Sequence, residues 1–444
     1  MLKTFPKGGV HPAENKIAED KPIEKLGLPK QVSIPIAQHI GAPSKPVVNK
    51  KDKVRVGDVI AESSGFVSSN IHSSVSGTVL KIDNVIDTTG YRKPCVIINV
   101  EGDEWNENID TSPELKQDFS LSSREIVDKV LKAGIVGMGG ATFPSHVKLS
   151  VPEGKKIDTL IINGVECEPY LTSDHRVMLE RADEMVVGIR LLMKALGVER
   201  AMIGIENNKP DAIEHLKGIV KDIEGIDVYP LKVKYPQGGE KQLIKALLNR
   251  EVPPGGLPLD VGTVVHNVGT ALAVYEAVQK NKPLFERVVT VTGKSISKPS
   301  NFMVRIGTPV NDLLEAAGGL PEDTGKVISG GPMMGKALNT FDVPVVKGTS
   351  GILVLTEKEA HRKREMNCIR CAKCVTVCPM LLQPYLLRKL SLLERFEEAE
   401  ENAILDCIEC GSCSFTCPSN IPLLDYIRYG KSNVNQLIRN RTQK

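Results

Sequence analysis

Two cysteine runs of identical spacing constrain this chain more than any other feature. They read CIRCAKCVTVCP at residues 368–379 and CIECGSCSFTCP at residues 407–418, so each follows the pattern C-x2-C-x2-C-x3-C-P. Eight of the ten cysteines fall in these runs, and 28 residues separate Cys378 from Cys407. In a chain with no apparent secretory signal, such clustering indicates metal binding rather than disulfide bonds.

This pattern is typical of proteins that hold two [4Fe-4S] clusters. Three thiolates at two-residue spacing wrap three corners of one cubane, and the fourth begins a stretch that leads away to the neighbouring cubane. The alternative is a pair of zinc sites, but zinc sites usually take their ligands as two pairs. We therefore expect one cluster on Cys368, Cys371, Cys374 and Cys417, and the other on Cys378, Cys407, Cys410 and Cys413. The isolated Cys95 and Cys167 are expected to be packed or incidental.

Composition narrows the function classes. The 444 residues are 41% hydrophobic and 25% charged, with a net charge of +3 and no basic run interleaved with aromatics, which argues against nucleic-acid binding. No stretch approaches the roughly 18 apolar residues of a membrane span, and the N-terminus lacks the apolar segment of a signal peptide. We expect a cytoplasmic protein that reaches a membrane only through a partner.

The pattern of the N-terminal part, residues 1–110, is mostly β. Residues 1–42 are predicted to form an irregular arm laid over another domain, and residues 45–101 to form short strands separated by turn residues. The strands resemble a lipoyl- or biotinyl-type barrel-sandwich hybrid. The expected hairpin tip at residues 71–76 has no lysine to modify, so a structural or docking role is favoured.

Residues 118–282 alternate between helix and strand, which predicts a mainly parallel sheet. A capping box at Ser122–Glu125 opens a helix that ends near Ala133. Further expected elements are strands at 159–162, 201–205, 228–233 and 264–266, and helices at 174–195 and 270–279.

The remaining chain is expected to form two smaller units. Residues 285–350 predict a β-grasp-like module, with strands at 288–291, 303–306 and 326–329 and a helix at 310–317. Residues 358–430 predict a helical domain that holds the two clusters.

Four polar loops of the α/β domain are candidates for a ligand site. They are the glycine loop GMGGATFP at 137–144, NGVECEPY at 163–170, YPQGGEK at 235–241 and NVGT at 267–270. Glycines allow backbone N–H groups to approach a phosphate, and loops at the carboxyl ends of parallel strands bind ligands. Each loop alone is weak evidence for a ligand site, because an ordinary solvated loop could have the same residues. Four such loops at one edge of a sheet are much stronger evidence than any one of them.

These loops resemble the flavin-binding subunit of respiratory complex I and of related NADH-linked hydrogenases. Together with the cysteine runs, the whole chain resembles the C subunit of Rnf-type electron transport complexes, in domain order. The resemblance implies a multidomain α/β fold: a barrel-sandwich hybrid, a Rossmann-like flavin domain, a soluble-ligand-binding β-grasp module and a two-[4Fe-4S] ferredoxin-type domain.

The resemblance also implies site residues. FMN is expected on Gly137, Gly139, Gly140, Lys148, Asn163, Glu166, Glu240, Asn267 and Thr270. Glu168 matches an acid near the nicotinamide, and Phe143 an aromatic that stacks on NADH. Three positions depart from the complex I pattern: Met138 replaces an Arg, Val165 replaces an Asp, and Gly239 replaces the first acid of a G-E-E stretch.

The implied function is that of a NADH-oxidising or NAD-reducing subunit of a membrane-bound ferredoxin:NAD oxidoreductase coupled to Na⁺ or H⁺ translocation. NADH delivers two electrons at once and a cluster accepts one, so a flavin belongs between them. Its partners would be the other members of the complex, especially one bearing ferredoxin-like clusters, on the cytoplasmic side of the membrane. The alternatives are a diaphorase-type subunit of a soluble oxidoreductase, a non-catalytic electron relay, and a cobalamin-reductase-like scaffold.

Overall fold

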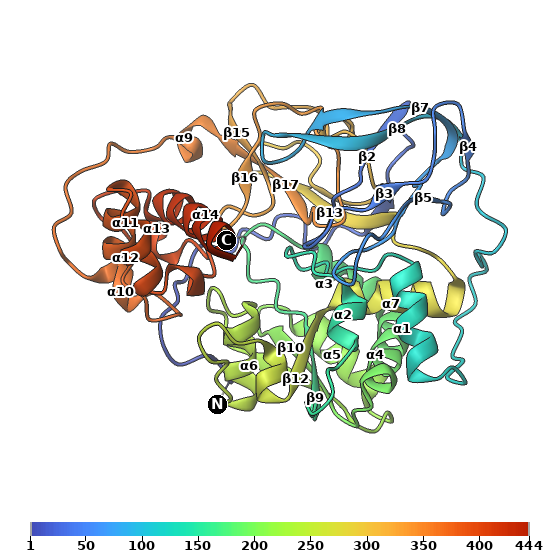
Figure 1. The fold of residues 1–444 in the computed structure, drawn as a ribbon, viewed down its shortest axis with the longest axis horizontal. Helices are drawn as coiled ribbons and strands as arrows, with labels where there is room; N and C mark the ends of the chain where they lie inside the picture. Colours follow the sequence, from blue (N-terminus) through green and yellow to red (C-terminus); the bar gives the residue numbers. More distant parts are fainter. Residues whose placement is uncertain (1, 443–444) are drawn as a thin grey trace.

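The strands of this protein form four sheets in the computed structural model, which describes residues 2–442. Two small antiparallel sheets lie near the N-terminus, one four-stranded sheet is parallel, and one six-stranded sheet is mixed. Helices cover the parallel sheet and make up the C-terminal region (Figure 1). The multidomain α/β fold predicted from the sequence is confirmed.

The N-terminal β domain packs its two sheets around a shared core that includes Val79, Val96 and Ile98. The larger sheet has the order β2 (Gln31–Pro35), β8 (Arg92–Gly102), β7 (Ser76–Ile86) and β4 (Lys53–Val54). The smaller sheet has the order β3 (Lys45–Pro46), β5 (Val59–Glu62) and β6 (Ile71–His72). Alternating apolar residues on β7 and β8 supply the inward face, as the sequence pattern predicts.

The hairpin tip at residues 71–76 is buried against the mixed sheet. The Ser74 hydroxyl donates to the Ile306 carbonyl at 2.5 Å, and Arg305 donates to the Ser74 carbonyl at 2.7 Å. A carrier domain must leave its tip free, so these contacts support the expected docking role.

The α/β domain is built on a parallel sheet of order β11-β10-β9-β12. Its strands are β9 (Thr159–Asn163), β10 (Ala201–Glu206), β11 (Ile226–Leu231) and β12 (Thr263–Asn267). Its helices are α1 (Ser123–Lys132), α2 (Ser145–Leu149), α3 (Ser173–Glu180), α4 (Ala182–Leu196), α5 (Pro210–Val220), α6 (Glu240–Leu248), the 3-10 turn η1 (Pro258–Val261) and α7 (Val268–Lys280). The predicted capping box is present, because Ser122 and Glu125 bond reciprocally at the start of α1.

Two predictions in this domain need correction. The single helix expected at 174–195 is two helices, α3 and α4, separated at Arg181, whose backbone leaves the helical region with φ −129°. The break lets α3 pack on the mixed sheet while α4 packs along α7, and periodicity alone does not reveal it. The strand expected at 228–233 lies two residues earlier, because Ile226 is the buried start of β11.

The mixed sheet has the order β1 (Ile23–Lys25), β14 (Ser300–Arg305), β13 (Glu286–Thr292), β17 (Gly351–Thr356), β15 (Thr324–Ser329) and β16 (Lys336–Ala337). Helix α8 (Val310–Ala316) packs against its core. The N-terminal arm contributes β1, so it crosses onto this sheet as predicted for an arm laid over another domain. The prediction that residues 1–42 are irregular was wrong for residues 31–35, which form β2 because they pair with β8 of the β domain. Strand β17 lies beyond residue 350 and pairs with β13 and β15.

The C-terminal helical region follows the short helix α9 (Glu357–Ala360). Its elements are α10 (Lys373–Thr376), α11 (Pro384–Leu392), α12 (Phe396–Glu401), the 3-10 turn η2 (Ile404–Asp406), α13 (Ser412–Phe415) and α14 (Leu423–Thr442). Buried Leu387, Leu390 and Ile427 form its core between α11 and α14. Within residues 2–442, no helix has the length and apolar character needed to cross a bilayer.

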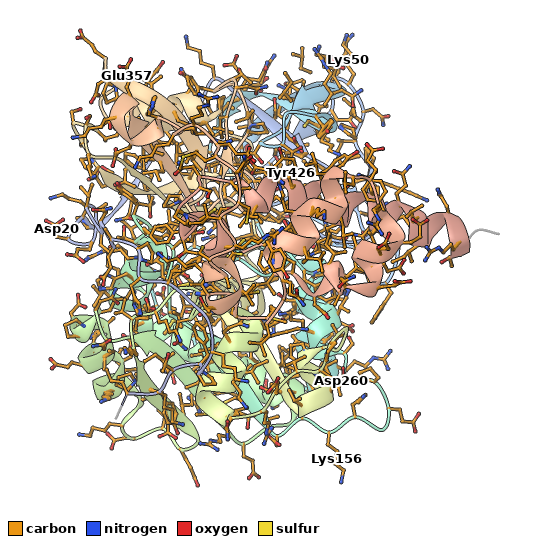
Figure 2. The ribbon with its side chains drawn as sticks, turned by 90° about the vertical axis from the view of Figure 1, so that its left-hand side faces the viewer. Asp20, Lys50, Lys156, Asp260, Glu357 and Tyr426 are labelled. Carbon is orange, nitrogen blue, oxygen red and sulfur yellow. The ribbon has the colours of Figure 1, made fainter. Side chains whose placement is uncertain are left out.

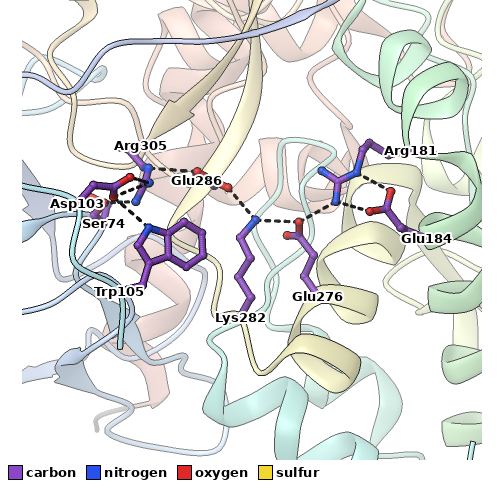
Figure 3. A network of polar contacts seen from close by, with 9 residues as sticks. All are labelled: Ser74, Asp103, Trp105, Arg181, Glu184, Glu276, Lys282, Glu286 and Arg305. Carbon is purple, nitrogen blue, oxygen red and sulfur yellow. Dashed lines mark hydrogen bonds and ion pairs between the residues drawn. The ribbon is translucent and has the colours of Figure 1, made fainter. Parts of the chain in front are cut away.

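A chain of ion pairs crosses the seam between the β domain, the mixed sheet and the α/β domain (Figure 3). Its members, in order of contact, are Asp103, Arg305, Glu286, Lys282, Glu276, Arg181 and Glu184. At its centre, Lys282 Nζ lies 2.8 Å from Glu276 and 2.7 Å from Glu286, and its side chain is only 12% exposed. Burial acts to lower the pKa of Lys282, but the two glutamates outweigh it and raise that pKa.

Replacing Lys282 should destabilise this seam. Lys282→Met removes the counter-charge that Glu276 and Glu286 share and leaves each carboxylate with one arginine partner, which costs up to about 3 kcal/mol. The midpoint of urea unfolding should therefore shift to a lower urea concentration. Lys81→Met, which removes an exposed pair with Asp83, is the control and should leave the unfolding curve unchanged. Equal unfolding curves for both variants would show that the ion-pair chain does not hold the seam.

Candidate functional site

The predicted site residues lie at the carboxyl edge of the parallel sheet. Lys156, in the loop before β9, and Asp260, in η1 just before β12, lie in the lower part of Figure 2, so the opposite edge of the sheet faces the interior of the molecule. Strands β9, β11 and β12 run parallel within one sheet, which brings the three loops that follow them to this edge. Open α/β sheets bind ligands here.

A backbone hydrogen bond joins the two ends of the glycine loop, and the middle of the loop is accessible. Gly137 N–H donates to the Phe143 carbonyl at 2.9 Å, which closes the loop and leaves the Phe143 side chain partly exposed. Gly140 has φ +109°, and a Cβ built on it meets no heavy atom within 4 Å. The backbone at Gly140 is therefore accessible to a ligand.

The same loop lies against the start of α7. Met138 N–H donates to Thr270 Oγ1 at 2.9 Å, and a Cβ on Gly139 would lie 3.5 Å from Asn267. Asn267 caps α7 by accepting from Gly269 N–H at 2.8 Å. A helix N-terminus beside a glycine loop favours a phosphate group, which agrees with the phosphate-lining role that the resemblance implies for these residues.

Lys148 and Glu240 meet across the site. Lys148 Nζ lies 2.7 Å from Glu240 Oε1 and 3.0 Å from the Val265 carbonyl. Beside them, His266 Nε2 is buried and has no hydrogen-bond partner among the described residues, and the same holds for Gln237 Nε2. Burial, and then the charge of Lys148, lowers the pKa of His266 to about 3. A glycine cradle, a lysine and unpartnered buried nitrogens at one edge fit a polar phosphate-bearing cofactor such as FMN.

The acidic loop after β9 is held mainly by its own neighbours. Asn163 Nδ2 donates to the Gly238 carbonyl at 2.8 Å, which ties the loop after β9 to the loop after β11. The Glu166 carboxylate accepts from the Asp174 and His175 N–H groups at 2.8 and 3.1 Å, so it caps α3. The proposed flavin contact of Glu166 therefore stays a prediction, and its carboxylate has a structural partner already.

The Glu168 side chain contacts the loop after β15 of the mixed sheet. Its carboxylate accepts from Met333 N–H at 3.2 Å and Met334 N–H at 2.8 Å, in the loop after β15. Burial raises the pKa of Glu168 to about 7. The structure thus places this acid where the α/β domain, the mixed sheet and the cysteine region meet, and its proximity to a nicotinamide stays a prediction.

Several residues of this site were not predicted from the sequence. Asp174 accepts from Asn267 Nδ2 at 2.6 Å, and burial, then Glu166, raises its pKa to about 7. His266 stands next to a predicted site residue, so adjacency was a usable signal. Cys167, expected to be packed or incidental, packs against an apolar cluster and accepts from Gly238 N–H at 3.4 Å.

Lys16 of the N-terminal arm is the least predictable member. Its ammonium donates to the carbonyls of Glu166, Glu168 and Leu171 at 2.9, 2.9 and 2.7 Å. Part of the side chain is exposed, but the ammonium is enclosed. Burial, and then the charge of Lys209, lowers the pKa of Lys16 to about 8. The arm therefore fixes the backbone of the loop that carries both predicted acids.

Four cysteines from the two runs line one cavity of the helical region. Cys378, Cys407, Cys410 and Cys413 surround a space of about 370 Å³, its open mouth included. Burial, followed by the three neighbouring thiols, raises the pKa of Cys413 to about 12. This is the set that crossed ligation assigns to one cubane. Among the described residues, no three metal-binding side chains surround the position of a single metal ion. A cubane does not need such a site, because each thiolate binds a different iron at a separate corner.

The other predicted set lies nearer the surface. Burial raises the pKa of Cys374, and the charges of Cys417 and Cys368 add to the increase, so these three thiols are neighbours. Cys368 and Cys371 are exposed, whereas Cys378, Cys410 and Cys413 are buried. We call the buried set the inner cluster site and the exposed set the outer cluster site.

The inner cluster site abuts the loops at the carboxyl edge. Tyr235 Oη donates to the Cys410 carbonyl at 2.8 Å, and Gln242 Nε2 contacts Met380 Sδ at 3.3 Å. Gly8 of the arm lies so close to Cys378 that an added Cβ would come within 2.7 Å of its backbone. The predicted flavin site and the inner cluster site are therefore in contact through Tyr235 and Gln242.

Comparison with protein families divides the chain in the same order. The profile of the RnfC barrel sandwich hybrid domain matches residues 3–103, and that of the Nuo51 FMN-binding domain matches residues 130–276. The SLBB domain matches residues 288–337, and the 4Fe-4S dicluster domain matches residues 367–422.

Full-length relatives share much of this sequence. The chain is 50% identical over 437 residues to the C subunit of a proton-translocating ferredoxin:NAD(+) oxidoreductase complex of Clostridium ljungdahlii, covering 97% of this chain and 94% of the relative. It is 45% identical over 401 residues to the C subunit of the Na(+)-translocating complex of Acetobacterium woodii, covering 89% of each. The C subunit of an ion-translocating oxidoreductase complex of Rhodobacter capsulatus is 42% identical, with 97% and 83% covered.

Among solved structures, the fold is similar to that of an NAD+-reducing [NiFe]-hydrogenase in the H2-reduced state. The TM-score is 0.50 at 19% identity, over 70% of this chain and 63% of that chain. This likeness concerns the fold alone.

Paired substitutions should reveal which cysteines share a cluster. With crossed ligation, Cys378→Ser with Cys410→Ser disables one cubane and leaves about four irons, whereas Cys371→Ser with Cys378→Ser disables both. Iron and sulfide analysis after anaerobic reconstitution measures this. Each double variant is the control for the other, and the reverse pattern of iron loss would establish that each run holds its own cubane.

Lys16 should stabilise the acidic loop in a pH-dependent way. Lys16→Met leaves three carbonyl groups without their hydrogen-bond donor. Each buried carbonyl that finds no other donor lowers the free energy of unfolding by about 1–3 kcal/mol. Because the folded pKa of about 8 lies below the ordinary 10.5, the unfolded chain binds this proton more tightly, so the group's contribution to stability increases as pH rises from 8 toward 10.5. Urea unfolding at both ends of that window should show this slope in the wild type but not in Lys16→Met.

Lys30→Met removes an exposed lysine of the same arm and should keep both the stability and the slope. A Lys16→Met variant with wild-type unfolding at both pH values would contradict this role.

Proposed function

Because the chain belongs to the family of C subunits of Rnf-type ion-translocating ferredoxin:NAD(+) oxidoreductase complexes, we propose that it is the NAD(H)-handling subunit of such a complex. It oxidises NADH or reduces NAD+ and exchanges single electrons with other subunits. Ion translocation is a property of the assembled complex. The observation that carries this proposal is the contact between the carboxyl edge of the parallel sheet and the inner cluster site through Tyr235 and Cys410.

FMN is the resident cofactor of the α/β domain. When bound, it exchanges electron pairs with NAD(H) and single electrons with iron–sulfur clusters. Gly137, Gly139 and Gly140, with Thr270 and Asn267 at the start of α7, hold its phosphate. Lys148, fixed by Glu240, orients the ring edge.

The surrounding residues keep these groups in place. Asn163 ties the acidic loop to Gly238, and Lys16 fixes that loop from the arm. Phe143 provides an apolar surface for the nicotinamide at the loop mouth. Because the pKa of Glu168 is raised to about 7, its carboxyl group holds a proton in part of the population at neutral pH, close to the inner cluster site.

The two cluster sites have different surroundings. The inner site, with Cys378, Cys407, Cys410 and Cys413, receives the contacts of the flavin-binding loops. The outer site, with Cys368, Cys371, Cys374 and Cys417, opens to solvent and serves the next carrier. The chain lies on the cytoplasmic side of the membrane, bound to its partner subunits.

This assignment differs in a measurable way from a soluble diaphorase subunit. The native protein should sediment with membranes and be released by conditions that dissociate subunits. A native complex found entirely in the soluble fraction would exclude membership of a membrane complex in this organism.

Cofactor content and single variants test the electron route. Reconstituted protein should hold about eight irons and one FMN, from two cubanes and one flavin site. Cys371→Ser or Cys410→Ser should retain NADH oxidation with a dye that accepts electrons at the flavin, while reduction of the natural acceptor falls at least about tenfold. Variants that reduced the natural acceptor at the wild-type rate would refute the route, and protein without FMN or dye reduction would support a non-catalytic relay.

A further inference from the structure

One exposed segment combines positive charge with two ligands of the outer cluster site. Every residue from 361 to 373 is exposed. The segment contains Cys368 and Cys371, one acidic residue, Glu365, and five basic residues, namely Arg362, Lys363, Arg364, Arg370 and Lys373. We call residues 361–373 the basic segment.

The middle of the basic segment is hydrogen-bonded to the helical region. Met366 N–H donates to the Ser419 carbonyl and Ser419 Oγ donates to the Asn367 carbonyl, both at 2.9 Å. Asn420 Nδ2 donates to the Arg364 carbonyl at 3.2 Å. The segment has no regular secondary structure, yet these bonds to the stretch after Cys417 give it a defined course.

Apolar side chains stand among these charges. Ile369, between two predicted ligands, is 69% exposed, and Met366 is 53% exposed. Exposed apolar residues surrounded by charge are typical of contact surfaces for other proteins. By contrast, the inner cluster site is covered by Tyr235, Gly8 and the loop with Met333, so it offers no comparable approach.

The position of the segment agrees with a role in contacting a partner. In Figure 1 it sweeps around the outer left side of the helical region between α9 and α10, away from the parallel sheet. A carrier that docks here would lie next to Cys368 and Cys371, the exposed thiols, and far from the loops that hold NAD(H).

We infer that the basic segment is the docking surface for an acidic protein that carries one electron at a time. This inference deepens the proposed function and rests on it. Oxidation of one NADH yields NAD+, one proton and two electrons, so two single-electron transfers to the acidic carrier balance each turnover. The charges steer the carrier to the outer cluster site, and Ile369 and Met366 form the close contact. Steering of this kind raises association rates by about 10- to 1,000-fold and weakens with salt.

Charge-reversal variants of the reconstituted protein test this surface. One pairs Arg370→Glu with Lys373→Glu, and a second pairs Lys363→Glu with Arg364→Glu, outside the ligand run. The control pairs Lys50→Glu with Lys51→Glu, which are exposed on the β domain at the other end of the molecule (Figure 1, Figure 2). The probe is a purified, strongly acidic two-[4Fe-4S] ferredoxin immobilised on a sensor, with binding followed at increasing salt.

Both segment variants should bind the ferredoxin at least about tenfold more weakly at low salt, with a reduced salt dependence. The control should bind like the wild type, and NADH-driven dye reduction should be unchanged in all. If the wild-type protein itself showed no NADH-driven dye reduction, that result would count against the proposed function.

Three results would overturn the inference. The first is that the Lys363→Glu, Arg364→Glu variant, which leaves the ligand run unchanged, binds ferredoxin as strongly as the wild-type protein. The second is an equal loss in the Lys50→Glu, Lys51→Glu control, which would indicate unspecific attraction. The third is segment-dependent binding to vesicles of phosphatidylcholine and phosphatidylglycerol with none to ferredoxin, which would make the segment a membrane contact.

Discussion

The packing of Tyr235 against Cys410 joins the two kinds of chemistry in this chain. The Tyr235 hydroxyl donates to the Cys410 carbonyl, and both residues belong to an apolar cluster with Val10 of the arm. Tyr235 opens the loop after β11, and Cys410 lies in the second cysteine run. This contact helps to orient the helical region on the α/β domain. The orientation matters because electrons pass only between cofactors that lie close together. The loop with Met333, held by Glu168, completes the junction from the mixed sheet.

The N-terminal arm acts as a tie between all the domains. It supplies β1 to the mixed sheet and β2 to the β domain, and Lys16 binds the acidic loop of the α/β domain. Near its start, Gly9 N–H donates to the Val377 carbonyl at 2.8 Å, just before Cys378. The order of the arm comes from these hydrogen bonds to separate domains and from its buried apolar side chains, among them Phe5, Val10 and Ile34.

The exposure of the two cluster sites differs because the two cysteine runs meet different neighbours. The second run packs against the flavin-binding loops and α14, which buries Cys410 and Cys413. In the first run Cys378 is buried beside Gly8 of the arm, whereas Cys368 and Cys371 are exposed. Two runs of the same spacing therefore differ in exposure: the second run is more buried, beside the carboxyl edge of the parallel sheet, and the first run is more exposed.

Local patterns predicted most of the fold. The alternation in β7 and β8, the capping box at Ser122 and the apolar strands of the parallel sheet depend on neighbours close in sequence, and all are present. The break at Arg181 was missed, because it follows from packing against α7 and the mixed sheet. Site residues were predicted where they stand at strand ends, but Asp174 and Lys16 carry no local signal.

The sequence by itself predicted two clusters, which agrees with the match to the 4Fe-4S dicluster domain, and it predicted the thiolates available to each, because cysteine spacing sets how far a thiolate can reach along the chain. It also determined that polar loops would share one edge of a parallel sheet. Only the tertiary structure decided which cluster site faces inward, where the carboxylates of Glu166 and Glu168 point, and that an arm lysine supports them. These properties depend on contacts between residues more than 100 positions apart, and such contacts arise from the packing of whole domains.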